Sequence, residues 1–287
     1  MTDLALPQKP LIRRAKGWLL AAICVVVIAM MLAPLALSFL ASIRPVAETT
    51  AVPPTWLPQS LSTENYEKII SYQQGIWTYV RNSGSVALMT IVMCLGLSVP
   101  AGYALARFPI PGKEAWFLLI LSSMMVPYQA LLVPLYLMFA TFGLTSSHFG
   151  LAILHTILQL PFSIYLMRNS FEAIPKELEE AAHVDGASSA FQLRRIFMPL
   201  AAPGMVTVAL FAFITSWNEF LGALILMNKE TAFTVPIMMT GVVSGNYGAV
   251  DWGALQASVV VSMVPCLLVY LALQKYYVSG LLAGAVK

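Results

Sequence analysis

The strongest constraint on the fold is a long stretch near the start of the chain that carries no ionic side chain. Residues 17–43 contain no Asp, Glu, Lys or Arg, and a helix of that length crosses a hydrocarbon core of about 30 Å with some tilt. The whole chain of 287 residues is 59% hydrophobic and only 10% charged, whereas soluble domains are nearer half apolar and a quarter charged. The sequence therefore predicts an all-α membrane protein.

Five further apolar stretches complete a prediction of six transmembrane helices. They are residues 80–106, 115–142, 149–167, 201–227 and 252–277. Pro127 and Pro134 interrupt the third of them, so kinks are expected there. A cleaved signal peptide is the alternative for residues 17–43, but the apolar core of such a peptide is only about 7 to 15 residues long. The sequence therefore favours an uncleaved first span.

The distribution of Lys and Arg predicts the orientation of these helices. Arg44, Lys68, Arg81 and Lys229 lie in segments assigned to the outside, and the other Lys and Arg residues lie in segments assigned to the cytoplasm. Because loops rich in positive charge stay in the cytoplasm, residues 1–16 are predicted to be a cytoplasmic leader and residues 279–287 a cytoplasmic tail. Residues 44–79, which are rich in proline, are predicted to be an external loop with a short helix starting near Thr63. Residues 80–278 then form a five-span core.

Residues 171–199, here called the charged loop, are the longest charge-rich interval of the chain. Good helix formers begin near Lys176, and their acidic side chains gather toward the helix N-terminus. Gly186 suits a left-handed bend, and Ser188 and Ser189 suit the start of a second helix. Pro199 suits the start of the next membrane helix. The charged loop is therefore predicted to form two short helices joined by a bend, a shape suited to docking.

The spacing within the charged loop is similar to that of a known family. Glu180-Ala181-Ala182, Gly186, Ile196 and Pro199 follow one another at the spacing of the EAA loop of ABC importer permeases. The chain resembles the maltose-type carbohydrate-uptake class of these permeases, also in Asp185-Gly186-Ala187, in residues 216–221 (SWNEFL) and in residues 280–287 (GLLAGAVK). The resemblance implies a cytoplasmic coupling loop between spans four and five, formed by Glu180, Ala181, Ala182, Asp185, Gly186, Ile196 and Pro199.

The resemblance also implies partners and a location. A permease of this class lies in the bacterial cytoplasmic (inner) membrane as a multi-pass protein, here with both termini cytoplasmic. It pairs with a second homologous permease, two ATP-binding-cassette ATPase subunits and an extracytoplasmic sugar-binding protein. ATP and Mg²⁺ are bound by the partner ATPases, and no cofactor is expected in this chain. The implied function is to couple ATP hydrolysis to alternating access for a sugar or sugar derivative.

The sequence contains none of the common catalytic motifs. It has no Walker A sequence, no His-Glu-x-x-His pair and no Gly-x-Ser-x-Gly elbow, so the chain is not expected to be an enzyme or to bind a metal, and no nucleic acid is expected as a partner. Cys24, Cys94 and Cys266 lie inside apolar runs and are interpreted as packing residues. His148, His155 and His183 are scattered, which favours structural roles. The alternative function is a self-sufficient secondary transporter or channel, which would ordinarily carry a chain of intramembrane charges.

One acidic residue breaks the pattern of uncharged spans. Glu219 lies in the fifth predicted span, and ionisable groups inside membrane segments usually face a pathway or a partner. We therefore expect Trp217, Asn218 and Glu219 to line the substrate pathway. The competing interpretation is structural, with Glu219 accepting hydrogen bonds from backbone donors or pairing with a cation such as Arg81. Residues 233–239 are expected to be partly embedded, as a short re-entrant segment.

Overall fold

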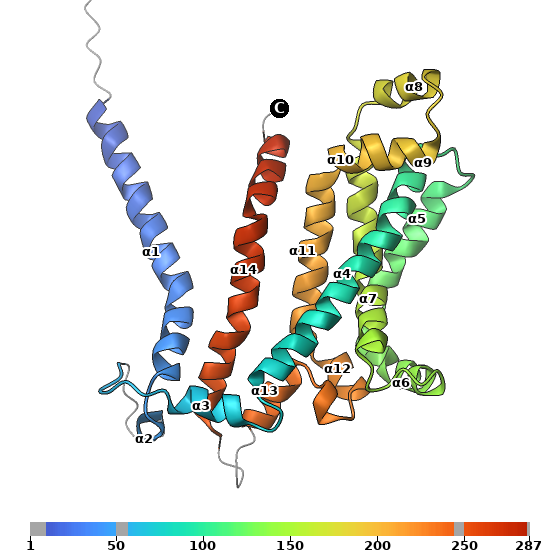
Figure 1. The fold of residues 1–287 in the computed structure, drawn as a ribbon. Helices are drawn as coiled ribbons and strands as arrows, with labels where there is room; N and C mark the ends of the chain where they lie inside the picture. Colours follow the sequence, from blue (N-terminus) through green and yellow to red (C-terminus); the bar gives the residue numbers. More distant parts are fainter. Residues whose placement is uncertain (1–9, 50–56, 244–249, 286–287) are drawn as a thin grey trace, which may run out of the picture.

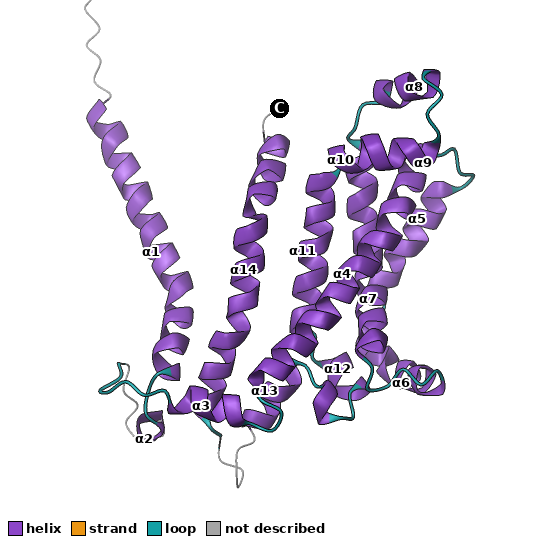
Figure 2. Ribbon diagram, in the orientation of Figure 1, coloured by secondary structure: helices purple, strands orange, loops and turns teal. Residues whose placement is uncertain are grey.

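The computed structural model describes residues 10–49, 57–243 and 250–285, and it describes side chains from residue 17 to residue 274 within those ranges. The described residues form helices joined by short loops, with no β-strand among them (Figure 2). Within these ranges, four helices are long and apolar enough to cross a membrane. They are α1 (Pro10–Ser42), α4 (Ile76–Arg107), α7 (His148–Glu172) and α14 (Trp252–Ala285). Two further pairs of helices each pass the same test when a sharp bend is allowed.

The centre of the molecule is formed by α4, α7 and α11 (Ala202–Asn218), with α14 and α1 beside them (Figure 1). Small residues allow the helices to approach closely. A Cβ atom at Gly102 on α4 would lie 2.7 Å from the Cβ of Met167 on α7, and one at Gly204 on α11 would lie 2.1 Å from the Ser170 hydroxyl oxygen. Membrane helices pack through such small residues because lipid provides no hydrophobic force between them.

The third predicted span is broken more sharply than a kink. The chain forms α5 (Lys113–Ser122) and the short helix η1 (Ser123–Met125), and then turns by 83° into η2 (Tyr128–Leu131) and α6 (Leu132–Thr141). The break falls at Pro127, as expected. Pro134 causes no second break because it lies in the first turn of α6, where the missing N–H is not needed. As a result, α6 lies across one end of the molecule (Figure 1).

The fifth predicted span is two helices rather than one continuous helix. Its first part, α11, ends at Asn218, Glu219 has an extended backbone, and α12 (Leu221–Leu226) follows. The chain continues through η4 (Glu230–Ala232) into α13 (Val235–Val243). The apolar side chains of Val235 and Met238 on α13 are buried against the protein, so the segment expected to be embedded is a helix covered by its own chain.

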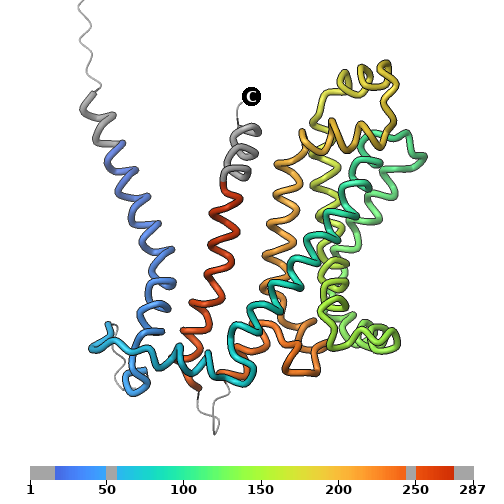
Figure 3. The backbone as a smooth tube through the Cα atoms, viewed as in Figure 1, coloured from blue at the N-terminus to red at the C-terminus, as the bar shows by residue number. Residues whose placement is uncertain are grey.

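The two ends of the molecule carry different elements. The first residues of α1 and the last residues of α14 lie at the same end as α8 (Glu177–Val184) and α9 (Ser189–Gln192) (Figure 1). The coloured parts of α1 and α14 in Figure 3 run from the opposite end toward this one. The opposite end carries α2 (Val46–Thr49), α3 (Glu64–Ser71), α6, α12 and α13. The helix expected near Thr63 is α3. The last helix, α14, continues to Ala285, so most of the predicted tail is helical.

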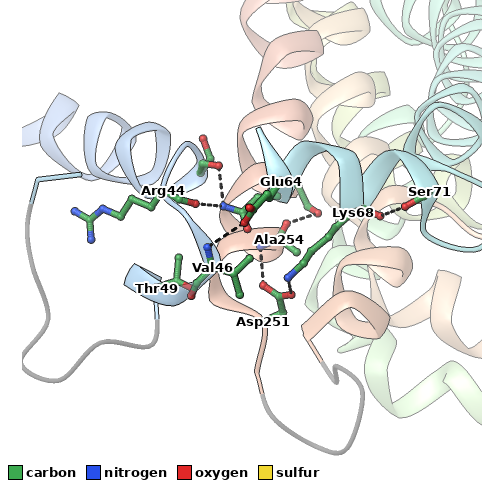
Figure 4. Close-up of polar contacts among 11 residues, drawn as sticks. Arg44, Val46, Thr49, Glu64, Lys68, Ser71, Asp251 and Ala254 are labelled. Atoms are coloured by element: carbon green, nitrogen blue, oxygen red, sulfur yellow. Dashed lines mark hydrogen bonds and ion pairs between the residues drawn. The ribbon is translucent and has the colours of Figure 1, made fainter. Parts of the chain in front are cut away.

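Polar contacts hold α3 against the end of α1 and the start of α14 (Figure 4). The buried Asn65 amide donates to the carbonyl oxygens of Ser42 at 3.0 Å and Arg44 at 2.7 Å. Lys68 and Asp251 form an ion pair at 2.5 Å, and the other oxygen of Asp251 accepts a bond from the Ala254 N–H at the start of α14. These contacts join three segments that are far apart in the sequence.

Candidate coupling surface and solute groove

The charged loop folds into two helical segments around a bend, as its sequence predicts. The first segment is α8, and Gly186 after it has a φ of +74°, the left-handed conformation that favours glycine. The Ser188 hydroxyl then accepts a hydrogen bond from the Phe191 N–H at 3.4 Å and caps α9. The Gln192 amide donates to the Ala187 carbonyl at 2.9 Å, which ties the second segment back to the bend.

A hollow of about 770 Å³ lies between these two segments. Its lining contains most of the residues that the sequence assigned to coupling, namely Ala181, Ala182, Asp185, Gly186 and Ile196, together with Leu178, Ala187, Ser188 and Phe191. Glu180 is exposed outside the lining. Val184 at the end of α8 is 87% exposed, and Phe191 is 54% exposed. The charged loop thus presents a hollow whose edge carries both acidic and apolar side chains.

Pro199 does not start the next membrane helix. It lies in α10 (Met198–Leu200), the last turn of the second segment, and the chain then bends by 77°. The proline near the start of α11 is Pro203. The expectation for Pro199 was wrong because two prolines lie close together, and the sequence pattern alone does not tell which of them lies past the bend.

A group of buried aromatic rings fixes the charged loop to the core. The segment before α10 is a single turn of π-helix, η3 (Leu193–Phe197), and Phe197 at its end is fully buried. The Phe197 ring lies 5.1 Å from the ring of Tyr103 on α4 and 6.3 Å from that of Phe171 at the end of α7. Edge-to-face and tilted contacts of this kind contribute beyond their buried area.

Arg107 makes the polar connection between the core and α8. Its guanidinium donates to the Phe171 and Ile174 carbonyl oxygens, both at 2.5 Å, and lies 3.3 Å from the Glu179 carboxylate. It also lies over the Phe197 ring, 4.9 Å from the centroid. In the sequence analysis, Arg107 counted only as one of the positive charges that predict the orientation of the helices. Its position at the end of a span gave no signal of these contacts, because its partners lie far along the chain.

A second arginine, Arg168, lies near the C-terminal end of α7 and has a separate set of partners. Arg168 pairs with Glu114 at 2.6 Å and with Glu172 at 2.7 Å, and it lies over the Phe117 ring. Glu114 and Phe117 lie on α5 and Glu172 lies on α7, so these contacts of Arg168 join α5 to α7 rather than the core to the charged loop.

Trp217 and Asn218 lie at a groove of about 490 Å³, here called the Asn218 groove. The groove is lined by side chains from α1, α11, α13 and α14, namely Leu35, Trp217, Asn218, Pro236, Met239, Val259, Ser262, Met263, Cys266 and Leu267. The Trp217 indole N–H donates to the Ser262 carbonyl at 3.2 Å, and its ring stacks on Phe213. Asn218 is exposed, and its amide donates to the Ile214 carbonyl. The groove is therefore mainly apolar with an amide at its wall.

Glu219 faces away from the Asn218 groove and is not among its lining residues. Its side chain is only 6% exposed, and its carboxylate lies 3.2 Å from the Nε2 atom of His155 on α7. It accepts hydrogen bonds from the Tyr128 hydroxyl and from the N–H groups of Gly222 and Ala223. The bonds from backbone N–H groups match the structural interpretation of Glu219. The basic side chain beside its carboxylate is His155, however, and not Arg81.

The histidines and cysteines occupy several environments. His155 is buried and also lies 2.8 Å from the Ser216 hydroxyl, and His148 lies 3.2 Å from the Ala232 carbonyl. Cys94 is fully buried, as expected of a packing residue. Cys24 on α1 is exposed, so it does not pack against the described part of this chain.

Comparisons with known proteins agree with the resemblance in the charged loop. The family described as "Binding-protein-dependent transport system inner membrane component" matches residues 98–282. The chain is 33% identical over 252 residues to the diacetylchitobiose uptake system permease protein DasC of Streptomyces coelicolor, covering 87% of this chain and 89% of that protein. It is 32% identical over 275 residues to the trehalose transport system permease protein SugB of Mycobacterium tuberculosis, covering 96% and 98%.

The fold is also similar to a solved structure. A chain of a bacterial ABC transporter involved in the import of the acidic polysaccharide alginate matches with a TM-score of 0.78 and 26% identity, covering 95% of this chain and all of that one. The family match spans more than half of the chain and includes the whole charged loop. This protein therefore belongs to the binding-protein-dependent transport system inner membrane components, the membrane subunits of ABC importers.

Proposed function

We propose that this ABC importer subunit couples ATP hydrolysis in separate subunits to the movement of a sugar or sugar derivative across the cytoplasmic membrane. The observation that carries the coupling role is the clustering of Ala181, Ala182, Asp185, Gly186 and Ile196 around one hollow. Figure 1 supports this role, because α8 projects beyond the ends of the membrane helices, where a partner can reach it. The hollow would receive a segment of the ATPase, and Glu180 would contact the ATPase at the edge.

The attachment of the charged loop suits the transmission of movement. The Phe197 ring is buried against α4 and α7, and the Arg107 guanidinium holds both the end of α7 and Glu179 on α8. A displacement of α8 by a moving ATPase would therefore reach the core through a packed ring and an ion pair rather than through a loose linker. Pro199, at the end of the loop, would contribute to the bend into α11.

The Asn218 groove is the proposed path of the solute. An amide and a hydroxyl at its wall, from Asn218 and Ser262, can exchange hydrogen bonds with sugar hydroxyls. We assign Trp217 and Asn218 to the wall of this path, with Asn218 as the exposed group, whereas Glu219 lies next to them in the chain and faces away from the groove. A carbohydrate solute is supported by the relatives named for diacetylchitobiose and trehalose uptake. A ligand screen of the cognate binding protein would identify the sugar.

The proposed assembly contains a second homologous permease, two ATPase subunits and an extracytoplasmic sugar-binding protein, with lipid around the membrane helices. ATP and Mg²⁺ would be bound by the ATPase subunits, and this chain would supply no catalytic residue. The bent pair α5–α6 and the helix α11 would complete a six-span arrangement with both termini in the cytoplasm. The common position of α8 and the described ends of α1 and α14 supports that orientation (Figure 1).

Cross-linking tests the coupling role directly. In a variant without native cysteines, Ala181→Cys would be treated with a maleimide–succinimide reagent in the assembled complex, and the product would be identified by mass. We expect a cross-link to the ATPase from Ala181→Cys, because Ala181 lines the hollow. Pro111→Cys is the control, since Pro111 is exposed in the α4–α5 turn outside the charged loop. Equal cross-linking at both positions, or none at Ala181, would contradict the proposal.

A further inference from the structure

We propose that Glu219 is a positioning residue that holds two helix breaks together and so fixes Asn218 at the wall of the groove. The first break separates α11 from α12 at Glu219 itself, and the second separates η1 from η2 at Pro127. This inference rests on the proposed function in one respect, namely that the Asn218 groove is the path of the solute. The contacts of Glu219 carry the rest of it.

The carboxylate of Glu219 is fully used by groups of its own chain. Its Oε1 atom accepts hydrogen bonds from the Tyr128 hydroxyl at 2.8 Å and the Gly222 N–H at 2.7 Å. Its Oε2 atom accepts a bond from the Ala223 N–H at 3.0 Å and lies 3.2 Å from His155 Nε2. A carboxylate offers about four acceptor sites. None is left for a sugar hydroxyl in this arrangement, which argues against Glu219 as a direct solute ligand.

The two N–H groups bonded to Glu219 belong to the first turn of α12. Such N–H groups have no partner inside their helix and need an acceptor from elsewhere. Glu219 supplies it from the position where the backbone has left α11, with a ψ of 127°. One side chain therefore ends one helix, caps the next and sets the direction of the turn between them.

Tyr128 and His155 attach this turn to other elements. Tyr128 directly follows Pro127 and begins η2, so its hydroxyl joins the break in the third predicted span to the break in the fifth. His155 lies on α7 and contacts the first break, with Nδ1 at 2.8 Å from the Ser216 hydroxyl on α11 and Nε2 at 3.2 Å from the Glu219 carboxylate. The two breaks and α7 thus form one junction.

The junction also explains a glycine. A Cβ atom at Gly222 would lie 2.6 Å from the side chain of Leu154 on α7 and 3.1 Å from Glu219 Oε2. Only a glycine lets α12 approach both groups this closely. Since Asn218 directly precedes the junction and faces the groove, loosening the junction should change the position of Asn218 without touching the solute.

The test measures the reactivity of a thiol at position 218 in the assembled transporter. In an Asn218→Cys variant without native cysteines, an impermeant maleimide is applied in each nucleotide state, with and without the loaded binding protein. We expect Tyr128→Phe and Glu219→Gln to change the labelling rate by about five-fold, the size of effect that one hydrogen bond carries. Tyr165→Phe is the control, because Tyr165 lies on α7, is 39% exposed and contacts Phe117 and Phe162 outside the junction.

The same variants separate positioning from solute binding. A positioning role predicts that Tyr128→Phe lowers the maximal uptake rate and leaves the half-saturating concentration of the binding protein unchanged, and that Glu219→Gln is milder than Glu219→Ala. Unchanged labelling and uptake in Tyr128→Phe and Glu219→Ala would overturn the proposal. So would labelling of Glu219→Cys at the rate of Asn218→Cys with protection by the loaded binding protein. If Asn218→Cys reacts but is never protected, the proposed path fails, and the effect of Tyr128→Phe on its labelling still decides the role of Glu219.

Discussion

The Arg107 guanidinium lies 3.3 Å from the Glu179 carboxylate, and this pair connects the last turn of α4 to α8. The Arg107 side chain is only 3% exposed, whereas that of Glu179 is 29% exposed. The guanidinium is also bonded to two carbonyl oxygens at the end of α7. The pair of a buried cation and a partly exposed acid therefore resists movement of α8 relative to α7. Substitutions in this pair therefore test directly whether movement of α8 is transmitted to the core through it.

Arg107→Gln is expected to uncouple the transporter. The change leaves the Phe171 and Ile174 carbonyls without their donor, at a cost of about 1 to 3 kcal/mol, and it frees α8 to move alone. Uptake per ATP hydrolysed should fall, and Arg107→Lys should restore part of it. Arg168→Gln is the control, because Arg168 pairs with Glu114 and Glu172, which lie outside α8. Reconstituted vesicles give both rates, and an equal ratio in the two glutamine variants would contradict this role.

Gly186→Val should impair coupling through the backbone alone. The φ of Gly186 is +74°, and a Cβ atom there would meet nothing within 4 Å, so the cost is backbone strain of roughly 1 to 3 kcal/mol. Gly112 offers a matched control, with a φ of +67° and equally open space, in the α4–α5 turn. We expect Gly186→Val to lose substrate-stimulated ATPase activity in the assembled complex and Gly112→Val to keep it. An equal loss of ATPase activity in both variants would contradict a specific role of the Gly186 bend, because backbone strain at either turn would then have the same effect.

The Lys68–Asp251 pair should make the stability of the α3 region depend on pH. Burial acts to raise the pKa of Asp251, but the hydrogen bonds from Lys68 and the Ala254 N–H outweigh it, so the pKa lies below its ordinary value. The folded state is therefore stabilised above the ordinary Asp pKa of about 3.9, and this contribution is lost as the pH falls through the lowered pKa.

Asp251→Asn measures that contribution. Because the pair is partly exposed, with side chains 41% and 24% accessible, the variant should lose no more than about 1 kcal/mol at pH 7. Thermal unfolding of the purified protein in detergent gives the difference between wild type and variant at each pH. The difference should vanish at the acid end of the range, and a difference that grows on acidification would refute the assignment.

Reporter fusions test the orientation. A protein that fluoresces only in the cytoplasm should light when it is fused after Lys287 and stay dark when it is fused after Gln59 in a truncated chain. The expected result follows from the positive charges on the cytoplasmic side and from the common end of α8 and the described termini of α1 and α14. Fluorescence at Gln59 and none at Lys287 would invert the arrangement.

The sequence predicted the elements whose causes are local. Gly186 allows a left-handed bend, Ser188 caps a helix and Pro127 breaks one. These three features follow from the type of each residue and from its neighbours in the sequence. The same local spacing brought Ala181, Gly186 and Ile196 to one hollow.

The sequence missed the features that depend on distant partners. The bond between Tyr128 and Glu219 joins residues 91 positions apart, and that between Arg107 and Glu179 joins residues 72 positions apart. The break of the fifth predicted span was missed for the same reason, because Glu219 replaces the helix hydrogen bonds with contacts to α7 and η2. Position 219 is a glutamate rather than a proline or a glycine, so the sequence contained no local sign of a helix break there.

The most direct test of the account is solute uptake by vesicles that contain this chain with its second permease and ATPase subunits, supplied with the loaded binding protein. We predict uptake only with ATP on the side of α8, and its loss in Ala181→Trp, whose bulk fills the hollow, while the complex stays assembled. Uptake of the solute by this chain alone, without ATP or the binding protein, would contradict the account and identify a self-sufficient transporter.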